Sequence, residues 1–394
     1  MRISELTAYH VRIPLRRKIR HASHTRTDTD TLVVRCRLDD GTVGWGEGLP
    51  RQYVTGETIE GVFDLLRATD WKNQLGGKVE NLSDAIALCS RIELAGIPHG
   101  MRDCYGNSLR CALEIGILDA FARRFETPLS TVTSLVPEAA GVRKYSDRVQ
   151  YSATITSMGV FKQILRSWIY WYYGFHFMKV KVGVSGVNDA AMLRRIRFHG
   201  GSGFDLRIDA NEAWTCENLE AKLAPLLPYR ISSIEQPVPH ESVDGLAEVR
   251  KRISTPIMLD ESLCSLGDAH RAVERGTCDL FNIRLSKCGG FVNSLRIAAV
   301  AKQAGLACQL GCQVGETGIL SAAGRHFATS VGDLRYLEGS YDRFLVGEQR
   351  LTVEDITFGR GGFAPALTGP GLGVTIDPAA VERVKLSEER WQIL

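Results

Sequence analysis

From residue 149 onward the chain alternates short strand-like segments with helical ones, and this order constrains the fold more than any other feature. Helical patterns such as DAAMLRRIRF and SLRIAAVAKQAG separate the strands. Strands that alternate with helices over this length form parallel βαβ units, and eight of them predict a closed (β/α) barrel of the TIM type. The eight expected strands are VQYSATI (149–155), FMKVKV (177–182), FDLRIDA (204–210), ISSIEQ (231–236), PIMLD (256–260), LFNIRL (280–285), LACQLG (306–311) and LRYLEG (334–339).

The alternative is an open, doubly wound sheet. Such a sheet usually carries a glycine-rich phosphate loop after an early strand. The chain has no GxGxxG or Walker-type sequence, and GGSG at Gly200 precedes a strand, which is typical of a turn. The barrel is therefore the favoured fold.

The first 140 residues follow a different order and predict a separate α+β unit. ISELTAYHVRIPL (3–15) and TLVVRCRLDDGTVGWGEG (31–48) predict strands, the second stretch with a turn at Asp39, Asp40 and Gly41. NSLRCALEIGILDAFARRF (107–125) has helical spacing of apolar residues and opens with Asn107, a residue type suited to capping.

Bulk properties exclude several classes of protein. The net charge of +3 is too small to indicate nucleic-acid binding, and no run approaches the roughly 18 apolar residues of a membrane span. The ten cysteines form no paired CxxC units, and no signal peptide precedes them. We expect a cytoplasmic protein that binds neither nucleic acid nor membrane.

Polar residues recur at the carboxyl ends of the expected strands, where barrel enzymes assemble their sites. Side chains alternate along a strand, so Lys179 and Lys181 share one face of the second strand. The others, strand by strand, are Asp209 and Asn211, Glu235, Asp260, Lys287 and Glu316. In a barrel these side chains would converge.

Three converging carboxylates repel one another unless a cation compensates their charge. Hard oxygen ligands suit Mg²⁺, so Asp209, Glu235 and Asp260 are the expected metal ligands. The structural alternative is that each acid caps the following helix or binds a neighbouring lysine. For one acid alone that alternative is favoured, but for three on consecutive strand ends facing lysines we favour the metal.

The lysines then have a chemical role. A metal-bound carboxylate acidifies its α-carbon because the ion stabilises the enediolate that forms when the proton leaves. A neutral lysine can take that proton if a nearby positive charge lowers its pKa, and Lys179 supplies such a charge to Lys181. Lys287 would face the opposite side of the substrate. It is out of step with Asn282 and Arg284, so either the strand has ended or a bulge re-aims the side chain.

This combination of KxK, three acids and a lysine before Gly-Gly, with GWGEGLP near the start, resembles the enolase superfamily, specifically its muconate lactonizing enzyme subgroup. The resemblance implies a capping α+β domain (1–140), a modified barrel (141–365) and a C-terminal segment that returns to the cap (366–394). It also implies Lys181 as base on one face, Lys287 as acid or base on the other, and Lys179 as the helper of Lys181.

Departures within the superfamily narrow the reaction in part. The mandelate racemase subgroup uses a histidine on strand seven, and LACQLGCQVGE contains none. Dipeptide epimerases usually carry DxD at strand eight to hold the substrate ammonium, where this chain has Glu338 and Ser340. Either Glu338 or Asp342 could hold an amine. Cycloisomerases, o-succinylbenzoate synthases and N-acylamino acid racemases share the same catalytic set.

Cap loops set specificity in this family, and the matching segments carry His21, His24, Arg26, Arg51 and Tyr53. For each of these five alone, a surface-loop role without ligand contact is the favoured interpretation. The expected substrate-binding residues are Asn211, Glu316, Arg51, Tyr53 and His24.

We thus expect a Mg²⁺-dependent isomerase, either a racemase or epimerase or a cycloisomerase, that removes a proton α to the carboxylate of a small-molecule substrate and assembles as a homo-oligomer. The alternatives are a lyase of the same superfamily, similar to o-succinylbenzoate synthase or an acid-sugar dehydratase, and a catalytically silent binding protein.

Overall fold

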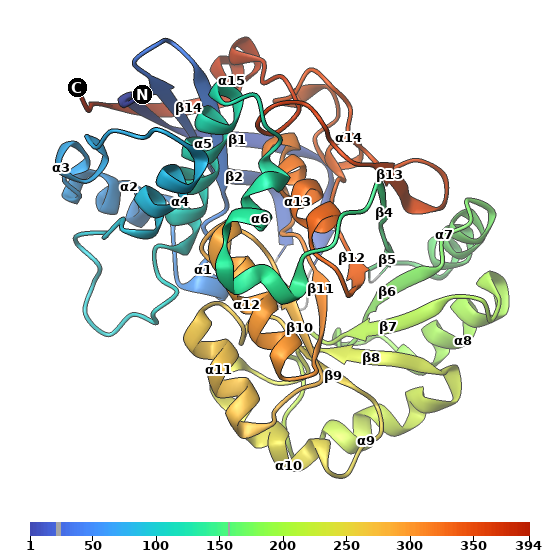
Figure 1. Ribbon diagram of the computed structural model, residues 1–394. Coiled ribbons are helices and arrows are strands. Elements are labelled where there is room, and N and C mark those ends of the chain that lie inside the picture. The colour runs from blue at the N-terminus through green and yellow to red at the C-terminus, as the bar shows by residue number, and fades with distance from the viewer. Residues whose placement is uncertain (21–24, 157) are drawn as a thin grey trace.

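A computed structural model describes residues 1–20, 25–156 and 158–394, with the side chains of 17–20, 25 and 26 left out. Its first sheet is antiparallel, in the order β14-β1-β2-β3, so the last strand of the chain lies beside the first. The two termini accordingly lie close together in Figure 1. The strands are β1 (Ile3–Arg20), β2 (Thr25–Leu38), β3 (Val43–Gly48) and β14 (Lys385–Gln392). The expected turn follows β2, where Gly41 has a φ of 88°.

Helices pack on one face of this sheet. The longest, α5, lies directly against β3, where Gly46 and Gly48 make the close approach possible. A Cβ atom on Gly46 would lie 2.0 Å from the carbonyl oxygen of Ala112, and one on Gly48 would lie 1.9 Å from that of Ser108. The helices are α1 (Gln52–Thr55), α2 (Ile59–Ala68), α3 (Trp71–Leu75), α4 (Leu82–Ser90), α5 (Asn107–Arg124) and α6 (Val132–Leu135).

The capping role expected of Asn107 is wrong. Gly106 occupies the N-cap position of α5, and Asn107 is the first helical residue. The Asn107 amide nitrogen instead donates to the carbonyl oxygens of Cys264 and Lys287, at 2.7 and 2.8 Å. A buried amide of the first unit therefore holds two barrel loops in place.

The second sheet is parallel and contains all eight strands expected from the sequence, each beside its neighbour in chain order. The amide of Ser152, just before the first strand, donates to the carbonyl oxygen of Leu337 in the last at 2.7 Å, so the two edges meet. The strands are β5 (Ala153–Ile155), β6 (Phe177–Lys181), β7 (Asp205–Asp209), β8 (Ile231–Glu235), β9 (Ile257–Leu259), β10 (Leu280–Ile283), β11 (Ala307–Leu310) and β12 (Leu334–Leu337).

One helix follows each of the first seven barrel strands and covers its outer face (Figure 1). After β12 the chain leaves the barrel and returns to the first sheet. The barrel helices are α7 (Val160–Tyr172), α8 (Asp189–Gly200), α9 (Leu219–Leu223), α10 (Leu246–Arg250), α11 (Leu266–Arg275), α12 (Phe291–Gln303) and α13 (Gly318–Ser330). The remaining elements are β4 (Arg148–Gln150), which pairs with β13 (Phe363–Pro365), and the helices α14 (Asp342–Leu345) and α15 (Pro378–Val384).

A buried carboxylate joins the first unit to the barrel. Glu47 in β3 accepts hydrogen bonds from the backbone amides of Thr317 and Leu320, at the start of α13. The domain boundaries at residues 140 and 365 stay a prediction.

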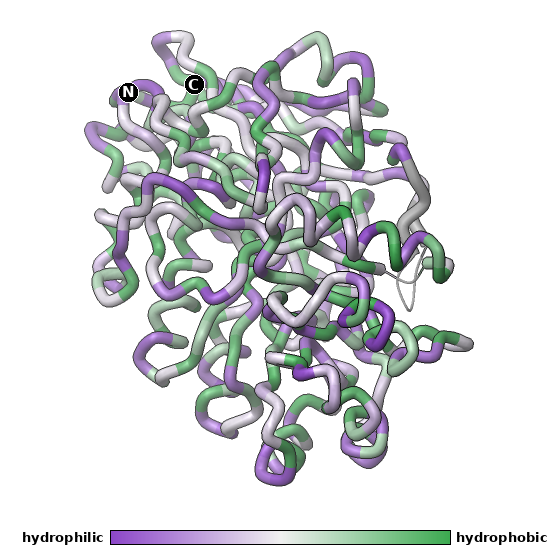
Figure 2. The backbone as a smooth tube through the Cα atoms, turned by 90° about the vertical axis from the view of Figure 1, so that its right-hand side faces the viewer, coloured by the Kyte–Doolittle hydropathy of each residue, from purple (hydrophilic) through white to green (hydrophobic). Residues whose placement is uncertain are grey.

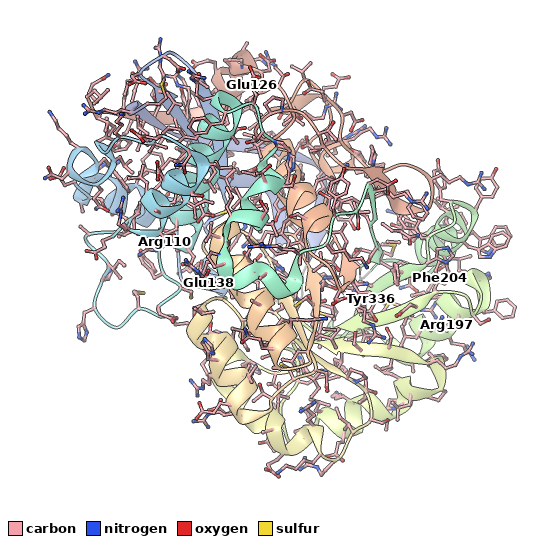
Figure 3. The ribbon with its side chains drawn as sticks, in the orientation of Figure 1. Arg110, Glu126, Glu138, Arg197, Phe204 and Tyr336 are labelled. Atoms are coloured by element: carbon pink, nitrogen blue, oxygen red, sulfur yellow. The ribbon has the colours of Figure 1, made fainter. Side chains whose placement is uncertain are left out.

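The amino end of the barrel is closed by Tyr336 of β12, labelled in Figure 3. Its hydroxyl lies within hydrogen-bond distance of Asp205 and Ser232, at 3.1 and 3.0 Å, and the Arg207 guanidinium lies 4.5 Å from its ring centroid. The barrel interior is therefore filled at this end, and any open site must lie at the carboxyl ends of the strands.

No helix in the described ranges is long and apolar enough to span a membrane.

Candidate active site

Strand register places Lys181 and two of the predicted acids in one row. Lys181 pairs with Asp209 across β6 and β7, and Asp209 pairs with Glu235 across β7 and β8. Asp260 is the first residue after β9, which is the next strand of the barrel. The alternation along β6 turns Met178 and Val180 toward the helices, so both lysines point into the barrel. The structure thus brings the predicted lysine pair and the predicted acids together.

Lys179 lies at the centre of an ion network. Its Nζ atom is 3.4 Å from carboxylate oxygens of both Asp209 and Glu235, and 2.8 Å from Oε2 of Glu338. Burial alone would lower the pKa of Lys179, but these carboxylates outweigh burial and hold it well above its usual value. Lys179 therefore stays charged beside Lys181.

Glu338 is held from two sides. Its second oxygen, Oε1, accepts from Arg207 at 2.5 Å. With two cations bound, this carboxylate is not available to a substrate ammonium group. Asp342 is no better placed, because it is buried, its pKa is raised to about 7 by burial, and it does not line the cavity described below. The two groups suggested as amine ligands are therefore unsuited to that role.

Lys181 is held by an asparagine. Its Nζ donates to Oδ1 of Asn211 at 2.6 Å and lies 3.6 Å from Asp209. The backbone amide of Asn211 donates to Asp209 in turn, and its side-chain amide donates to Glu261 at 3.3 Å. Asn211 has a φ of 42°, a left-handed conformation that asparagine tolerates better than most residues. This residue fixes where the Lys181 amine points.

Arg284, not Lys287, is the cation that faces the cavity from the sixth barrel strand. β10 ends at Ile283, and Asn282 and Arg284 keep its inward alternation. The Asn282 amide donates to Glu235 at 2.8 Å, while the Arg284 guanidinium contacts Asp260 and lies 3.5 Å from Glu235. Arg284 was not among the predicted site residues, although its alternation with Asn282 is the sequence signal that could have identified it.

The expected placement of Lys287 at the substrate is wrong. Its side chain is fully buried, and its Nζ donates to the carbonyl oxygens of Asp260, Leu263 and Asn282 at 2.6, 2.6 and 2.9 Å. An ammonium group has three hydrogens, and all three are used here. Because the strand has already ended, Lys287 turns back to join the loops that follow β9 and β10.

The three acids fit a divalent cation chemically. Oδ2 of Asp209 and Oδ1 of Asp260 are buried without a hydrogen-bond partner among the described residues. Burial and the neighbouring Asp209 raise the pKa of Glu235 to about 7. A lysine Nζ lies 3.4 Å from the Asp209 oxygen and 3.2 Å from the Asp260 oxygen, yet neither oxygen accepts a hydrogen bond. Buried carboxylate oxygens without a donor can still take a cation as a ligand.

Within the described ranges, no three His, Cys, Asp or Glu side chains are arranged to hold a metal as they stand. The physical reason is that Asp209, Glu235 and Asp260 turn toward Lys179, Lys181, Arg284 and Lys287.

A cavity of about 560 Å³ opens above these groups. Tyr53 and Asn211 line it, as expected. Its outer part is aromatic and basic. The lining residues that matter for the chemistry are Lys179, Lys181, Asn211, Glu261, Arg284 and Glu338 near the strand ends, and Arg16, Tyr53, Arg166, Tyr170, Tyr173, Phe175, Arg343, Phe344, Phe358 and Arg360 farther out.

Two expected substrate-binding residues do not line this cavity. Arg51 is buried, and its guanidinium donates to the carbonyl oxygens of Asp30, Pro50 and Val314. Glu316 is buried too, accepts from the amide of Gln313, and has a pKa raised to about 8 by burial. Both side chains therefore bind other parts of the chain and do not line the cavity. His21 and His24 lie outside the described residues, as does the side chain of Arg26.

Comparison with known proteins gives consistent matches. Residues 165–380 match the family model described as Enolase C-terminal domain-like. A hydrophobic dipeptide epimerase of Enterococcus faecalis is 29% identical over 84% of this chain and 88% of its own. An N-succinyl-L-Arg/Lys racemase of Bacillus cereus is 26% identical over 99% of both chains. The crystal structure of a dipeptide epimerase from Cytophaga hutchinsonii, complexed with Mg and the dipeptide D-Ala-L-Val, aligns with a TM-score of 0.83 and 25% identity over 99% of this chain and 100% of that one.

Proposed function

The chain belongs to the Enolase C-terminal domain-like family and is an isomerase of the enolase superfamily, and we propose that it uses Mg²⁺ and Lys181 to remove the proton α to a substrate carboxylate. The observation that carries the proposal is the shared row of Lys181, Asp209 and Glu235 at the carboxyl ends of adjacent strands, with Lys181 lining the cavity.

Asp209, Glu235 and Asp260 are the residues that would hold the metal. The buried oxygens of Asp209 and Asp260 that accept no hydrogen bond support this assignment, as do the raised pKa of Glu235 and the Mg complex of the related Cytophaga hutchinsonii enzyme. When bound, Mg²⁺ supplies positive charge that stabilises a substrate carboxylate as its α-proton leaves.

Lys181 is the base in this proposal. It lines the cavity, and its amine is aimed by Asn211. Asn211 and Lys179 act through Lys181 and are positioning residues. Tyr53, from the first unit, lines the cavity.

The cavity favours a substrate with a second anionic group over one with a free amine. The carboxyl groups that line it are Glu338, bound by two cations, and Glu261, whose pKa is raised well above its usual value by burial and by Asp260. Arg16, Arg166 and Arg360 line the outer part, and none forms an ion pair within the described part of the chain. N-acylated amino acids with a distal carboxylate and muconate-type diacids fit this arrangement.

A deuterium-exchange screen tests the proposal. Dipeptides, N-succinylamino acids and muconate-type diacids are incubated with the enzyme in D₂O, with Mg²⁺ or with EDTA, and the α-proton is followed by NMR. For substrates that carry a second anion, we expect metal-dependent exchange and products whose mass differs from that of the substrate only by the deuterium taken up. Loss of water in the product would indicate the lyase alternative, and no exchange with any member would leave the silent binding protein.

Exposed aromatic residues on the outer barrel helices support a homo-oligomer. On α7 and α8, five large side chains lie in solvent although their type favours burial: Phe161, Trp168, Trp171, Tyr172 and Phe198. Figure 2 views the molecule from the side on which these two helices lie in Figure 1. Light scattering of wild type and Trp171→Glu tests this assembly, with a smaller mass expected for the variant.

A further inference from the structure

Lys181 and Arg284 lie on opposite sides of the barrel. Lys181 ends β6 and Arg284 follows β10, and these strands are four positions apart in a barrel of eight. Both side chains line the same cavity. A substrate carboxylate bound at the floor between them has one face toward the Lys181 amine and the other toward the Arg284 guanidinium.

An arginine cannot replace a lysine as a base at such a position. Its guanidinium has five N–H donors, no acceptor, and stays protonated in proteins. In this structure the group is also fixed, since it contacts Asp260 and lies 3.5 Å from Glu235. Arg284 can stabilise negative charge on its side of the substrate, but it neither takes up nor delivers a proton.

No other described side chain offers a base on that side. Lys287 has all three hydrogens committed to carbonyl oxygens and is not part of the lining. Cys312 and Gln313 follow the neighbouring β11 and do line the cavity, but an amide does not titrate, and burial holds the pKa of Cys312 well above its usual value. Glu261 accepts from Asn211, so its carboxyl group is tied to the residue that holds Lys181.

From this geometry we infer that the enzyme transfers protons on one face of the substrate only, with Lys181 both removing and returning the α-proton and Arg284 acting as a fixed cation on the other face. This inference rests on the proposed function and makes it more specific. A two-base exchange that inverts the α-carbon has no second base here. Among isomerases, the geometry fits a cycloisomerase acting on a diacid.

The chemical step balances without any co-reactant. One carboxylate oxygen of the substrate adds to the β-carbon of a C=C bond, so a C–O bond forms. The electron pair of the double bond moves to the α-carbon, which takes a proton from the Lys181 ammonium. In the reverse direction the neutral Lys181 amine takes the α-proton, the double bond re-forms and the C–O bond breaks. Substrate and product have the same composition.

The stereochemistry of exchange tests the inference in the wild-type enzyme. Enantiopure amino-acid substrates that exchange in the screen above are incubated with Mg²⁺ in D₂O, and α-deuteration is measured by NMR beside inversion by chiral chromatography. For a lactone formed from a diacid, NMR shows instead whether deuterium enters one or both of the two α-positions, and transfer on one face predicts one. We expect deuterium to enter with retention and inversion to be at least ~100-fold slower, the lower end of what a positioned acid or base contributes. Inversion at a rate similar to exchange would overturn the inference while leaving the proposed function intact. Exchange of no substrate would overturn both.

A gain-of-function variant gives a second readout. Arg284→Lys places a titratable amine on the opposite face, so we expect inversion to rise relative to exchange by at least ~10-fold, a fraction of the ~100-fold that a well-placed base contributes. Arg252→Lys makes the same chemical change at an exposed ion pair with Glu220 and serves as the matched control. An unchanged ratio in a folded Arg284→Lys enzyme that still exchanges would contradict the assignment of Arg284. If this variant does not fold, the wild-type stereochemistry alone decides.

Discussion

The Lys181 ammonium donates a 2.6 Å hydrogen bond to Oδ1 of Asn211. The contact joins the proposed base to a residue of the adjacent strand end whose φ of 42° disfavours most substitutions. Asp shares the size of Asn and tolerates this backbone conformation. Asn211→Asp therefore changes the charge beside Lys181 with little change in shape.

We expect Asn211→Asp to lower kcat/KM at neutral pH. The added carboxylate stabilises the ammonium form of Lys181, so the acid limb of the pH–rate profile should move upward by about 1 to 3 pH units. The measurement is kcat/KM of the exchange reaction from pH 6 to 10, with circular dichroism as a control for folding. An unchanged profile would show that Asn211 does not control the base.

Lys287→Met should reduce stability more than it reduces catalysis by folded enzyme. The substitution leaves three carbonyl oxygens without their donor and the nearby carboxylate of Asp260 without a cation 3.2 Å away. Removing one partner of a buried charge pair costs about 3 to 5 kcal/mol. Urea unfolding should report this loss. Lys302→Met, at an exposed ion pair with Asp333, should cost less than about 1 kcal/mol. A variant with wild-type stability and no exchange activity would restore Lys287 as a catalytic residue.

Mg²⁺ affinity should rise with pH and level off near neutrality. Burial and Asp209 raise the pKa of Glu235 to about 7, so this carboxyl group is mostly protonated below that value and must lose its proton to bind a cation. We expect affinity to change by about tenfold per pH unit on the acid side. Calorimetry at several pH values in two buffers of different ionisation enthalpy measures both affinity and proton release. Affinity independent of pH between 5 and 7 would contradict the role of Glu235.

Buried Glu114 should make the protein less stable as pH rises. An acid whose pKa is lowered on folding has the opposite effect. Burial raises its pKa to about 7, although backbone amides of Phe291 and Val292 at the start of α12 partly oppose the shift. The folded state binds this proton more tightly than the unfolded chain does. The stabilisation that results is therefore fully present below the unfolded pKa of about 4.3 and is lost as pH rises toward 7. Glu114→Gln should flatten the fall in unfolding free energy across that window. If the free energy of unfolding fell equally with pH in wild type and variant, Glu114 would not be the group responsible.

The fold followed from the sequence because its signals are local. Each barrel strand is a short apolar stretch with period-two alternation, and that period turned Lys179 and Lys181 inward together. The parallel order then brought Asp209 and Glu235 level with Lys181. These contacts depend only on strand positions and neighbour order, which the sequence specifies.

Residues beyond the strand ends were harder to place, because side-chain direction in a loop has no periodicity. Lys287 lies after β10 has ended, and only the surrounding carbonyl groups determine where its ammonium points. Arg51 and Asn107 have polar side chains that suggest a surface loop and a helix cap. Both are buried because they satisfy backbone groups of distant segments, and such contacts depend on the assembled fold.

The most direct test of the account is α-proton exchange by Lys181→Ala in D₂O, with Mg²⁺ binding measured on the same sample. If Lys181 is the base, exchange should fall by at least ~100-fold while the variant still binds Mg²⁺ through Asp209, Glu235 and Asp260. Exchange at the wild-type rate in a folded, metal-binding Lys181→Ala protein would contradict the central claim.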